Sequence, residues 1–189
     1  MTDKIKLKWE INDEAYLEMN KLCMEIISFR DKYTLKECFA LVQENMQNLY
    51  ENSVLSWDDE AKWREMSMDS LCYICLYSTE RRKLVGFMSF EETVEADLPC
   101  LYLYELQITK DMRRRGCGSW LMKQLIRIAE QRQIPYVFLT VFGKNEQALN
   151  FYHQFQFYPH PTSPQSKTFR SGRVVHPDYY ILYTNIKNN

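Results

Sequence analysis

The spacing of apolar residues predicts a long amphipathic helix between Thr34 and Tyr50. The apolar positions that recur there are Leu35, Cys38, Leu41, Val42, Met46 and Leu49. A period near 3.6 residues places such positions on one face, which the helix buries against the rest of the protein. The string TLKE at residues 34–37 has the form of a capping box, so we expect the helix to begin at Thr34.

Further apolar runs have the length and flanks of β-strands. They are LCYICLYS (71–78), KLVGFMSFEE (83–92), CLYLYELQI (100–108) and YVFLTVF (136–142). The polar string TERR between the first two predicts a hairpin, and the nearly continuous apolar character of YVFLTVF is typical of a strand covered on both faces. The run LCMEIISF (22–29) is too short for periodicity to separate a strand from a helix, and SWDDEAKWREM (56–66) is expected to form a loop and a short helix.

A second amphipathic helix is expected between the last two strands, beginning near Ser119. Its apolar positions are Leu121, Met122, Leu125, Ile128 and Ala129, and its polar positions are Lys123, Gln124, Arg127 and Glu130. Strand, helix and strand in this order predict a βαβ crossover. The turn before the helix, RRRGCGSW, carries Gly116 and Gly118, which allow positive φ and leave room for a ligand to touch the backbone. The unpaired N–H groups of the helix start, with arginines beside them, predict a phosphate-binding site.

Composition limits the kinds of protein that this chain can be. With 189 residues, 46% hydrophobic and 14% aromatic, it has the size of one domain, residues 1–189, with residues 1–20 as a peripheral segment. A net charge of -1 predicts that electrostatic recognition is local, and we expect no direct binding of nucleic acid. No apolar run could span a bilayer and the first residues lack the apolar core of a signal peptide, so we expect an intracellular protein that binds no membrane.

The cysteines and histidines predict neither a metal site nor a catalytic triad. Cys72 and Cys75 form a C-x-x-C pair, but residues three apart in a strand point to opposite faces and cannot share a metal ion. The other four of the six cysteines are scattered, which favours ordinary buried thiols. The three histidines lie in the last quarter, without a serine or cysteine in a recognisable nucleophile context.

A pattern of fixed residues extends from the glycine turn to the segment after the last of these strands. The turn reads R-x-x-G-x-G in Arg113, Gly116 and Gly118, and Leu121 excludes both a dinucleotide fingerprint and a Walker loop. The later residues are Asn145, Ala148, Phe151 and Tyr152. Together they resemble the GCN5-related N-acetyltransferase (GNAT) family, with Gln156 where most of these enzymes have Gly. The resemblance implies an α/β domain whose mixed, mostly antiparallel sheet splays between two central parallel strands and is flanked by helices.

The resemblance also implies that acetyl-CoA is the co-substrate, with no metal. Its pyrophosphate would lie on the glycine turn, and backbone amides of the preceding strand would bind the pantetheine and polarise the acetyl carbonyl. The implied cofactor-binding residues are Leu106, Gln107, Ile108, Arg113, Arg114, Arg115, Gly116, Cys117, Gly118, Ser119 and Asn145.

Acetyl transfer to an amine needs an acceptor for the amine proton and a donor to the carbonyl oxygen. A regular pleat would place Glu105 on one face of its strand with Leu103 and Gln107, and Tyr104 on the other with Tyr102 and Leu106. Glu105 is then a carboxylate on an otherwise apolar strand, where desolvation would raise its pKa. The residues alone leave open whether Glu105 is a base or is tied to a structural Arg or Tyr. The resemblance implies that it is the general base, acting directly or through water.

Several longer strings are similar to one branch of this family. Four strings, which span about Met46 to Leu182, match in order and spacing the enzymes that acetylate the N-terminal amines of histone H4 and histone 2A; they are NMQNLYENS, YLYELQI, LTVFGKN and DYYIL. Leu55 stands where that branch has Trp. The resemblance implies an Nα-acetyltransferase for N-termini that begin Ser-Gly-Arg-Gly. Its partners would be the histone tails, and it would act in a ternary complex, as a monomer without an auxiliary subunit, in the cytoplasm and nucleus.

The substrate contacts that this branch implies are Tyr50, Thr93, Glu95, Tyr104, Thr140 and Tyr179. Tyr104 is also implied as a catalytic residue, and Glu95, acting through water, is the next candidate for the base. Thr93 replaces an expected Asp, so Glu95 would pair with the Arg at the third substrate position. The acidic run EETVEAD (91–97) is otherwise a solvated turn. The alternatives are an acetyltransferase for a lysine or small amine and a non-catalytic acyl-CoA-binding module.

Overall fold

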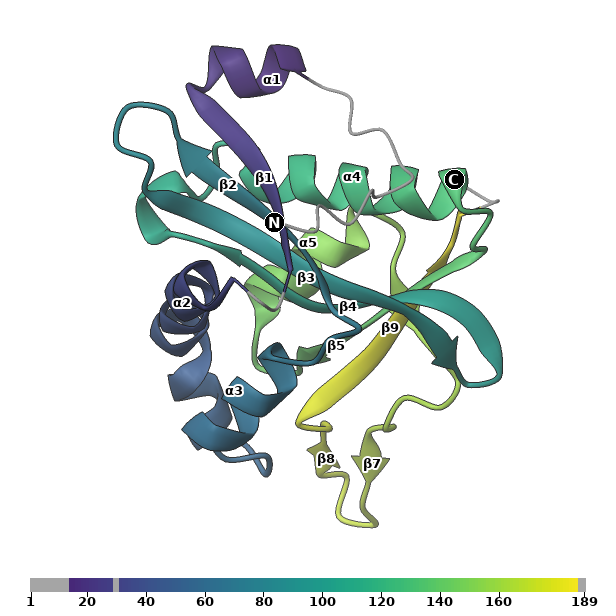
Figure 1. Cartoon of the computed structure of the whole chain (residues 1–189). Helices are drawn as coiled ribbons and strands as arrows, with labels where there is room; N and C mark the ends of the chain where they lie inside the picture. Colours follow the sequence, from purple (N-terminus) through teal and green to yellow (C-terminus); the bar gives the residue numbers. More distant parts are fainter. Residues whose placement is uncertain (1–13, 29–30, 187–189) are drawn as a thin grey trace.

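A computed structural model describes residues 14–28 and 31–186, which form one main sheet with helices on both faces (Figure 1). The strand order of this sheet is β1-β2-β3-β4-β5-β9-β6. Its strands are β1 (Leu22–Ser28), β2 (Cys72–Ser78), β3 (Leu84–Glu95), β4 (Leu98–Ile108), β5 (Tyr136–Phe142), β6 (Tyr158–Pro159) and β9 (Tyr179–Asn185). A separate two-stranded ribbon consists of β7 (Lys167–Thr168) and β8 (Val174–Val175).

The sheet opens at its centre, between β4 and β5. These two strands run parallel, whereas the other neighbours in the sheet are antiparallel. They pair only from Cys100 with Tyr136 to Leu103 with Leu139. Beyond these four pairs, residues 104–108 of β4 and 140–142 of β5 are not paired with each other. The mixed, mostly antiparallel sheet with its central splay is therefore confirmed.

Helices divide between the two faces of the sheet (Figure 1). Helices α2 (Lys32–Glu51) and α3 (Asp59–Met66) pack on one face, here called the α2–α3 face. Helices α1 (Glu14–Met19), α4 (Cys117–Gln131) and α5 (Glu146–His153) contribute to the core on the other, the α4 face. The 3-10 turn η1 (Lys110–Met112) joins β4 to the loop before α4. None of the helices in the described part of the chain is long and apolar enough to cross a membrane.

Helix α2 begins two residues earlier than its sequence predicts. Asp31 is the N-cap, and its carboxylate accepts hydrogen bonds from the Thr34 backbone N–H at 3.1 Å and from the Thr34 hydroxyl at 2.9 Å. The prediction that Thr34 caps the helix is therefore wrong. Asp31 lies three residues upstream of Thr34, so its carboxylate satisfies the free N–H in the first turn.

The run 22–29, whose type the sequence left open, forms strand β1 in its first seven residues, and Phe29 lies outside the described residues. The predicted β2–β3 hairpin is confirmed. Strand β3 continues to Glu95, beyond the expected end at Glu92. The turn to β4 consists of Ala96 and Asp97, with φ of +49° and +62°, as tight two-residue hairpins require.

The cysteines behave as ordinary thiols in this fold. Cys72 packs against the core on the α4 face, whereas Cys75 belongs to the core on the α2–α3 face, so the prediction that they point apart is confirmed. All six cysteines lie among the described residues and are free. The Cys75 Sγ instead lies 3.9 Å from the Sγ of Cys38 in α2.

Candidate active site

A β-bulge in β4 places Glu105 and Tyr104 on the same face of the sheet. The register with β3 passes from Leu103 directly to Glu105 on the β4 side, so Tyr104 has no partner on β3. Leu103 belongs to the core on the α4 face, whereas Glu105 contacts α3 and Tyr104 packs against the core on the α2–α3 face. The expected regular alternation along this strand is therefore wrong, because the extra residue of the bulge turns Glu105 to the face that carries Tyr104.

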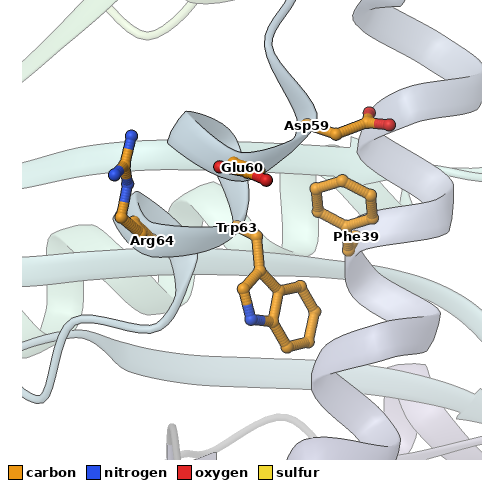
Figure 2. A pocket seen from close by; sticks show the side chains of 5 residues that line it. All are labelled: Phe39, Asp59, Glu60, Trp63 and Arg64. Atoms are coloured by element: carbon orange, nitrogen blue, oxygen red, sulfur yellow. The ribbon is translucent and has the colours of Figure 1, made fainter.

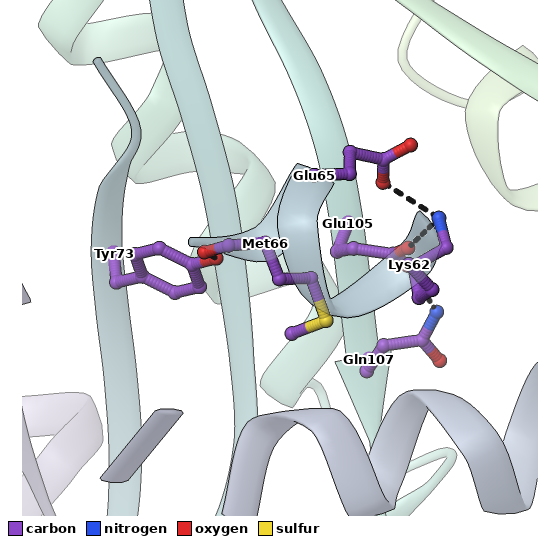
Figure 3. A network of polar contacts seen from close by, with 6 residues as sticks. All are labelled: Lys62, Glu65, Met66, Tyr73, Glu105 and Gln107. Atoms are coloured by element: carbon purple, nitrogen blue, oxygen red, sulfur yellow. Dashed lines mark hydrogen bonds and ion pairs between the residues drawn. The ribbon is translucent and has the colours of Figure 1, made fainter. Parts of the chain in front are cut away.

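The Glu105 carboxylate lies beneath α3 in a network of polar contacts (Figure 3). Glu105 is 5% exposed, and its Oε1 lies 3.2 Å from the Nζ of Lys62. Its Oε2 accepts a hydrogen bond from the Nε2 of Gln107 at 2.7 Å. Lys62 Nζ also lies 2.6 Å from Oε1 of Glu65, whose side chain is 37% exposed. The network therefore leads from a buried carboxylate, through a buried ammonium group, to a carboxylate at the surface.

Lys62 is a site residue that the sequence analysis did not identify. Helix α3 starts at its cap Asp58, and the Tyr73 hydroxyl donates to the Met66 carbonyl at 2.5 Å where the helix ends (Figure 3). The buried residues of α3 are Lys62 and Met66, which lie on one face because they are four residues apart. The sequence feature that could have indicated Lys62 is its position one helical turn before Met66, which faces the core.

Burial and charge act in opposite directions on the Lys62–Glu105 pair. Burial raises the pKa of Glu105 above its usual value, and the nearby Lys62 ammonium opposes this shift. The expectation that desolvation raises this pKa is confirmed. Burial alone would lower the pKa of Lys62, but the negative charges of Glu105 and Glu65 outweigh it, so the pKa of Lys62 is raised. Lys62 is therefore an ammonium ion at neutral pH, and Glu105 has the increased proton affinity that suits a base.

The turn between β4 and α4 presents free backbone N–H groups. Gly116 is the N-cap of α4 and has a φ of +87°, and the first backbone hydrogen bond of the helix runs from the Trp120 N–H to the Gly116 carbonyl at 2.8 Å. The N–H groups before that bond have no partner within the helix. They belong to Cys117, Gly118 and Ser119. The side chains of Arg114 and Arg115 are exposed and form no hydrogen bond or ion pair with the other described residues. These donors and charges fit the pyrophosphate of acetyl-CoA.

Arg113 of the same turn points to α2. Its guanidinium donates to the Oδ1 of Asn45 at 2.5 Å and to the Ile108 carbonyl at 3.3 Å. Asn45 in turn donates to the Oε1 of Gln107 at 3.0 Å, and Gln107 donates to Glu105. In this structure Arg113 therefore links the predicted cofactor turn to the Glu105 network.

Helix α1 packs against the same turn. The Tyr16 hydroxyl donates to the Arg115 carbonyl at 2.9 Å, and the Tyr16 ring stacks on Trp120 with centroids 6.1 Å apart. A Cβ atom at Gly116 would lie 3.3 Å from the Tyr16 hydroxyl oxygen. Residues 14–20 thus include a direct contact with the predicted cofactor turn, although α1 has no buried residue, while residues 1–13 lie outside the described residues.

The later motif lies against the glycine turn. Asn145 is the N-cap of α5, and its side-chain oxygen accepts a hydrogen bond from the Ala148 N–H at 3.2 Å. The Phe151 ring of this helix lies 3.5 Å from the place that a Cβ at Gly118 would take, and Leu106 of β4 lies 3.8 Å from it. The fold therefore brings the two sequence motifs together beside the opening in the sheet.

Aromatic side chains meet near Lys62 on the α2–α3 face. The Tyr50 ring packs edge-to-face on Phe142, with centroids 4.7 Å apart, and on Trp57 at 5.4 Å. Lys62 Nζ lies 5.0 Å from the centroid of the Tyr50 ring. Phe142 is paired with Tyr179 between β5 and β9. Two predicted substrate contacts, Tyr50 and Tyr179, are therefore both neighbours of Phe142.

Tyr104 and Thr140 take part in hydrogen bonds on either side of the opening. The Tyr104 hydroxyl donates to Oε1 of Glu91 at 2.8 Å, and the Tyr104 and Tyr102 rings are 5.2 Å apart. The Tyr102 hydroxyl lies 2.6 Å from the Oγ1 of Thr140, which bridges β4 and β5. Burial, with the contact to Glu91, raises the pKa of Tyr104. Tyr104 is therefore a neutral phenol at neutral pH and a hydrogen-bond donor.

The acidic run 91–97 is mostly strand and not a solvated turn. Glu91, Thr93 and Glu95 alternate onto one face of β3, which is the face that Tyr104 contacts through Glu91. Glu92 points to the other face, where it forms an ion pair with Arg132 at the end of α4. The run therefore divides its carboxylates between the two faces of the sheet.

Glu95 lies far from Glu105 along the strand. It is six residues beyond Ser89, the residue that pairs with Glu105, which corresponds to about 20 Å of strand. The structure does not bring these carboxylates together, so a role for Glu95 as the alternative base is not supported. Its role in substrate binding remains a prediction, as do the substrate contacts of Thr93 and Thr140.

A separate surface pocket lies between α2 and α3 (Figure 2). It is lined by Phe39, Asp59, Glu60, Trp63 and Arg64. None of these is a predicted site residue, and the Phe39 and Trp63 rings pack edge-to-face with centroids 5.5 Å apart. The candidate active site is therefore the opening beside Glu105 and not this pocket.

Comparisons of sequence are consistent with this assignment. A profile of the acetyltransferase (GNAT) family matches residues 36–157. N-alpha-acetyltransferase 40 of Saccharomyces cerevisiae is 29% identical over 184 residues, which cover 80% of this chain and 65% of the yeast protein. N-alpha-acetyltransferase 60 of Xenopus tropicalis is 30% identical over 93 residues, covering 47% and 38%. The chain thus spans less than two thirds of the length of either relative.

Solved structures show the same fold at low identity. A GNAT-family acetyltransferase from Staphylococcus aureus Mu50 superposes with a TM-score of 0.63 and 16% identity, covering 87% of this chain and 99% of its own. NAA60 of Arabidopsis thaliana, in complex with a bisubstrate analogue, gives a TM-score of 0.62 and 14% identity, covering 87% and 97%. At these identities the likeness establishes the fold alone.

Proposed function

Because this chain belongs to the acetyltransferase (GNAT) family, we propose that it is an Nα-acetyltransferase, which moves the acetyl group of acetyl-CoA to the free N-terminal amine of a protein. The observation that carries the proposal is the buried carboxylate of Glu105 on the strand where the sheet opens. Similarity to two N-alpha-acetyltransferases supports an N-terminal amine as the acceptor.

The residues around the opening supply what amine acetylation requires. When bound, acetyl-CoA supplies the thioester carbon that a neutral amine attacks. Arg114, Arg115 and the free N–H groups at the start of α4 would hold its pyrophosphate. Past Leu103, β4 is unpaired on its β5 side, so the backbone of residues 104–108 is available to the rest of the cofactor. Glu105 would accept the proton that the amine loses.

We further propose that the substrate is an N-terminus that begins Ser-Gly-Arg-Gly, as in histone H4 and histone 2A, which makes the enzyme NatD-type. Glu91 and Glu95 support a cationic substrate because both lie on the face of β3 that includes the Tyr104 contact. Tyr50 and Tyr179, grouped around Phe142, support a wall against the first substrate residues. A small second residue would fit between such rings, and an Arg at the third position would meet the carboxylates.

A peptide panel tests this proposal. The purified chain is incubated with acetyl-CoA and three peptides, one that starts Ser-Gly-Arg-Gly, one that starts Ser-Leu-Arg-Gly, and one with a blocked N-terminus and an internal lysine. We expect acetylation of the first peptide at its α-amine, located by mass spectrometry, and little of the others. Acetylation of the blocked peptide would favour the lysine alternative. Binding of acetyl-CoA without any transfer would favour a non-catalytic module.

A further inference from the structure

We propose that Lys62 is a positioning residue that keeps the Glu105 carboxylate ionised and oriented, so that Glu105 is ready to accept the proton of the substrate amine. This inference rests on the proposed function of the site. It assigns a role to a residue that touches neither the predicted cofactor turn nor the predicted peptide contacts other than Tyr50.

The geometry makes Lys62 the counter-ion of Glu105. Among the described residues, Lys62 is the one cation within ion-pair distance of Glu105, with Nζ at 3.2 Å from Oε1. The side chains of the pair are 7% and 6% exposed, so little water screens the attraction. On its solvent side, the same ammonium group lies 2.6 Å from Oε1 of Glu65. Lys62 is thus fixed between one buried and one half-exposed carboxylate.

The other groups that face Glu105 are uncharged or anionic. Gln107 donates one hydrogen bond from β4, and Ser89 is its partner on β3. The nearby phenols are those of Tyr50 in α2 and Tyr73 in β2 on the α2–α3 face, and that of Tyr152 in α5 in the core on the α4 face. Each of these phenols has a raised pKa through burial and is neutral at neutral pH. Glu65 adds negative charge, so only Lys62 favours the ionised form of Glu105 by its charge.

Without Lys62, the carboxylate of Glu105 would keep its proton. An unpaired carboxylate in such a buried place is neutralised by protonation, since its own burial already raises its pKa. A protonated Glu105 has no capacity to take a proton from an amine. Stability gives little reason to keep the pair, because apolar groups of similar volume often replace buried ion pairs without loss. The pair is therefore explained by the chemistry of Glu105.

The pH dependence of turnover tests the role of Lys62. We expect Lys62→Met to move the acidic limb of the kcat profile to higher pH by about 1–3 units, the usual effect of removing one close opposite charge. Activity at pH 7 would then fall about tenfold or more and recover as the pH rises. Lys62→Gln, which keeps a polar contact without the charge, is expected to show the same shift. Lys36→Met, at an exposed position of α2, is the matched control and should keep the wild-type profile.

Two outcomes would overturn the proposal. One is an activity loss in Lys62→Met and Lys62→Gln that is equal at every pH, which indicates a structural role alone. The other is an additional loss when Lys62→Met is combined with Glu105→Gln, because a residue that acts through Glu105 should have no further effect once the base is absent. Circular dichroism and thermal melting establish that each variant is folded. If either single variant fails to fold, the double variant is still expected to fold, because it contains no unpaired carboxylate at this place.

A titration without substrate separates this inference from the proposed function. In protein labelled with 13C at the glutamate carboxyl groups, the Glu105 signal is assigned by its absence in Glu105→Gln. We expect the midpoint of its titration to rise in Lys62→Met. An unchanged midpoint would refute the role of Lys62, whether or not the wild type acetylates peptides. A wild type inactive on every N-terminal peptide, with a raised midpoint in the variant, would refute the proposed function alone.

Discussion

Replacing Glu105 by glutamine is expected to lower kcat at least about 100-fold while the protein stays folded. An amide cannot accept the amine proton, and a general base typically contributes 10²–10⁴-fold to the rate. The KM for peptide is expected to change much less, because glutamine keeps the volume of the side chain and the missing interaction belongs to the transition state.

The contacts of Glu105 set the accompanying loss of stability. Removing one partner of a buried ion pair commonly costs about 3–5 kcal/mol. Lys62 keeps Glu65 as a second partner at 2.6 Å, so the loss of unfolding free energy should lie below that range, at about 1–3 kcal/mol. Part of it arises because the new amide N–H₂ would face the Gln107 N–H₂. Gln107 cannot turn its amide around without losing the hydrogen bond from Asn45.

The assay measures initial rates with a peptide that starts Ser-Gly-Arg, from the release of the CoA thiol, over a range of peptide concentrations. Thermal unfolding is recorded on the same preparations. Glu130→Gln, an exposed carboxylate near the end of α4, serves as the matched control and is expected to keep wild-type rates. A folded Glu105→Gln variant with kcat within threefold of wild type would refute the assignment of Glu105 as the base.

Three further results are expected. Gly116→Ala should weaken acetyl-CoA binding about tenfold by calorimetry, because φ is +87° and the added Cβ would lie 3.3 Å from the Tyr16 hydroxyl; wild-type affinity would contradict this. Glu95→Ala should reduce kcat/KM about tenfold or more for a Ser-Gly-Arg peptide and little for Ser-Gly-Ala, and zero coupling in this double-mutant cycle would remove Glu95 from substrate recognition. Because burial raises the pKa of Glu105, the folded protein binds that proton more tightly than the unfolded chain, so this stabilisation is present below the usual pKa of 4.5 and is lost as pH rises through the raised value. The melting temperature of wild type relative to Glu105→Gln should therefore fall as pH rises above 4.5, and a difference that does not change with pH would disprove the linkage.

Features set by local periodicity could be predicted from the sequence. The β2–β3 hairpin and helix α4 follow from the spacing of apolar residues and from the polar residues between the apolar runs. The crossover from β4 through α4 to β5 predicts that β4 and β5 are parallel. The two motifs that carried the family resemblance, around Gly118 and Phe151, lie side by side in the fold, although they are far apart in the chain. The hairpin and the helix could be predicted because they depend on residues that are close together in the chain.

Features set by distant parts of the chain could not be predicted. The bulge at Tyr104 depends on the register that β3 imposes, and a string such as YLYELQI contains no mark of an extra residue. Lys62 looks like any helical surface lysine until the fold places Glu105 beneath it. The ion pair of Glu92 with Arg132, which lies forty residues away, likewise depends on the fold, whereas the division of the acidic run between two faces follows from strand alternation.

The short seam between β4 and β5 has a consequence for how the protein unfolds. Strands β1 to β4 are joined by antiparallel pairing, whereas β5, β9 and β6 form a second block, and only four residue pairs connect the two blocks within the sheet. Opening along this seam breaks few backbone hydrogen bonds, so we expect it to be the partial unfolding that requires the least free energy, with hydrogen exchange at the seam residues 100–103 and 136–139 faster than in β2 or β3. A ligand that occupied the seam at 100 times its Kd would oppose that opening by about 2.7 kcal/mol. The cooperativity of unfolding would then depend on ligand concentration, with two partly independent blocks in the free protein and a single unit in the complex.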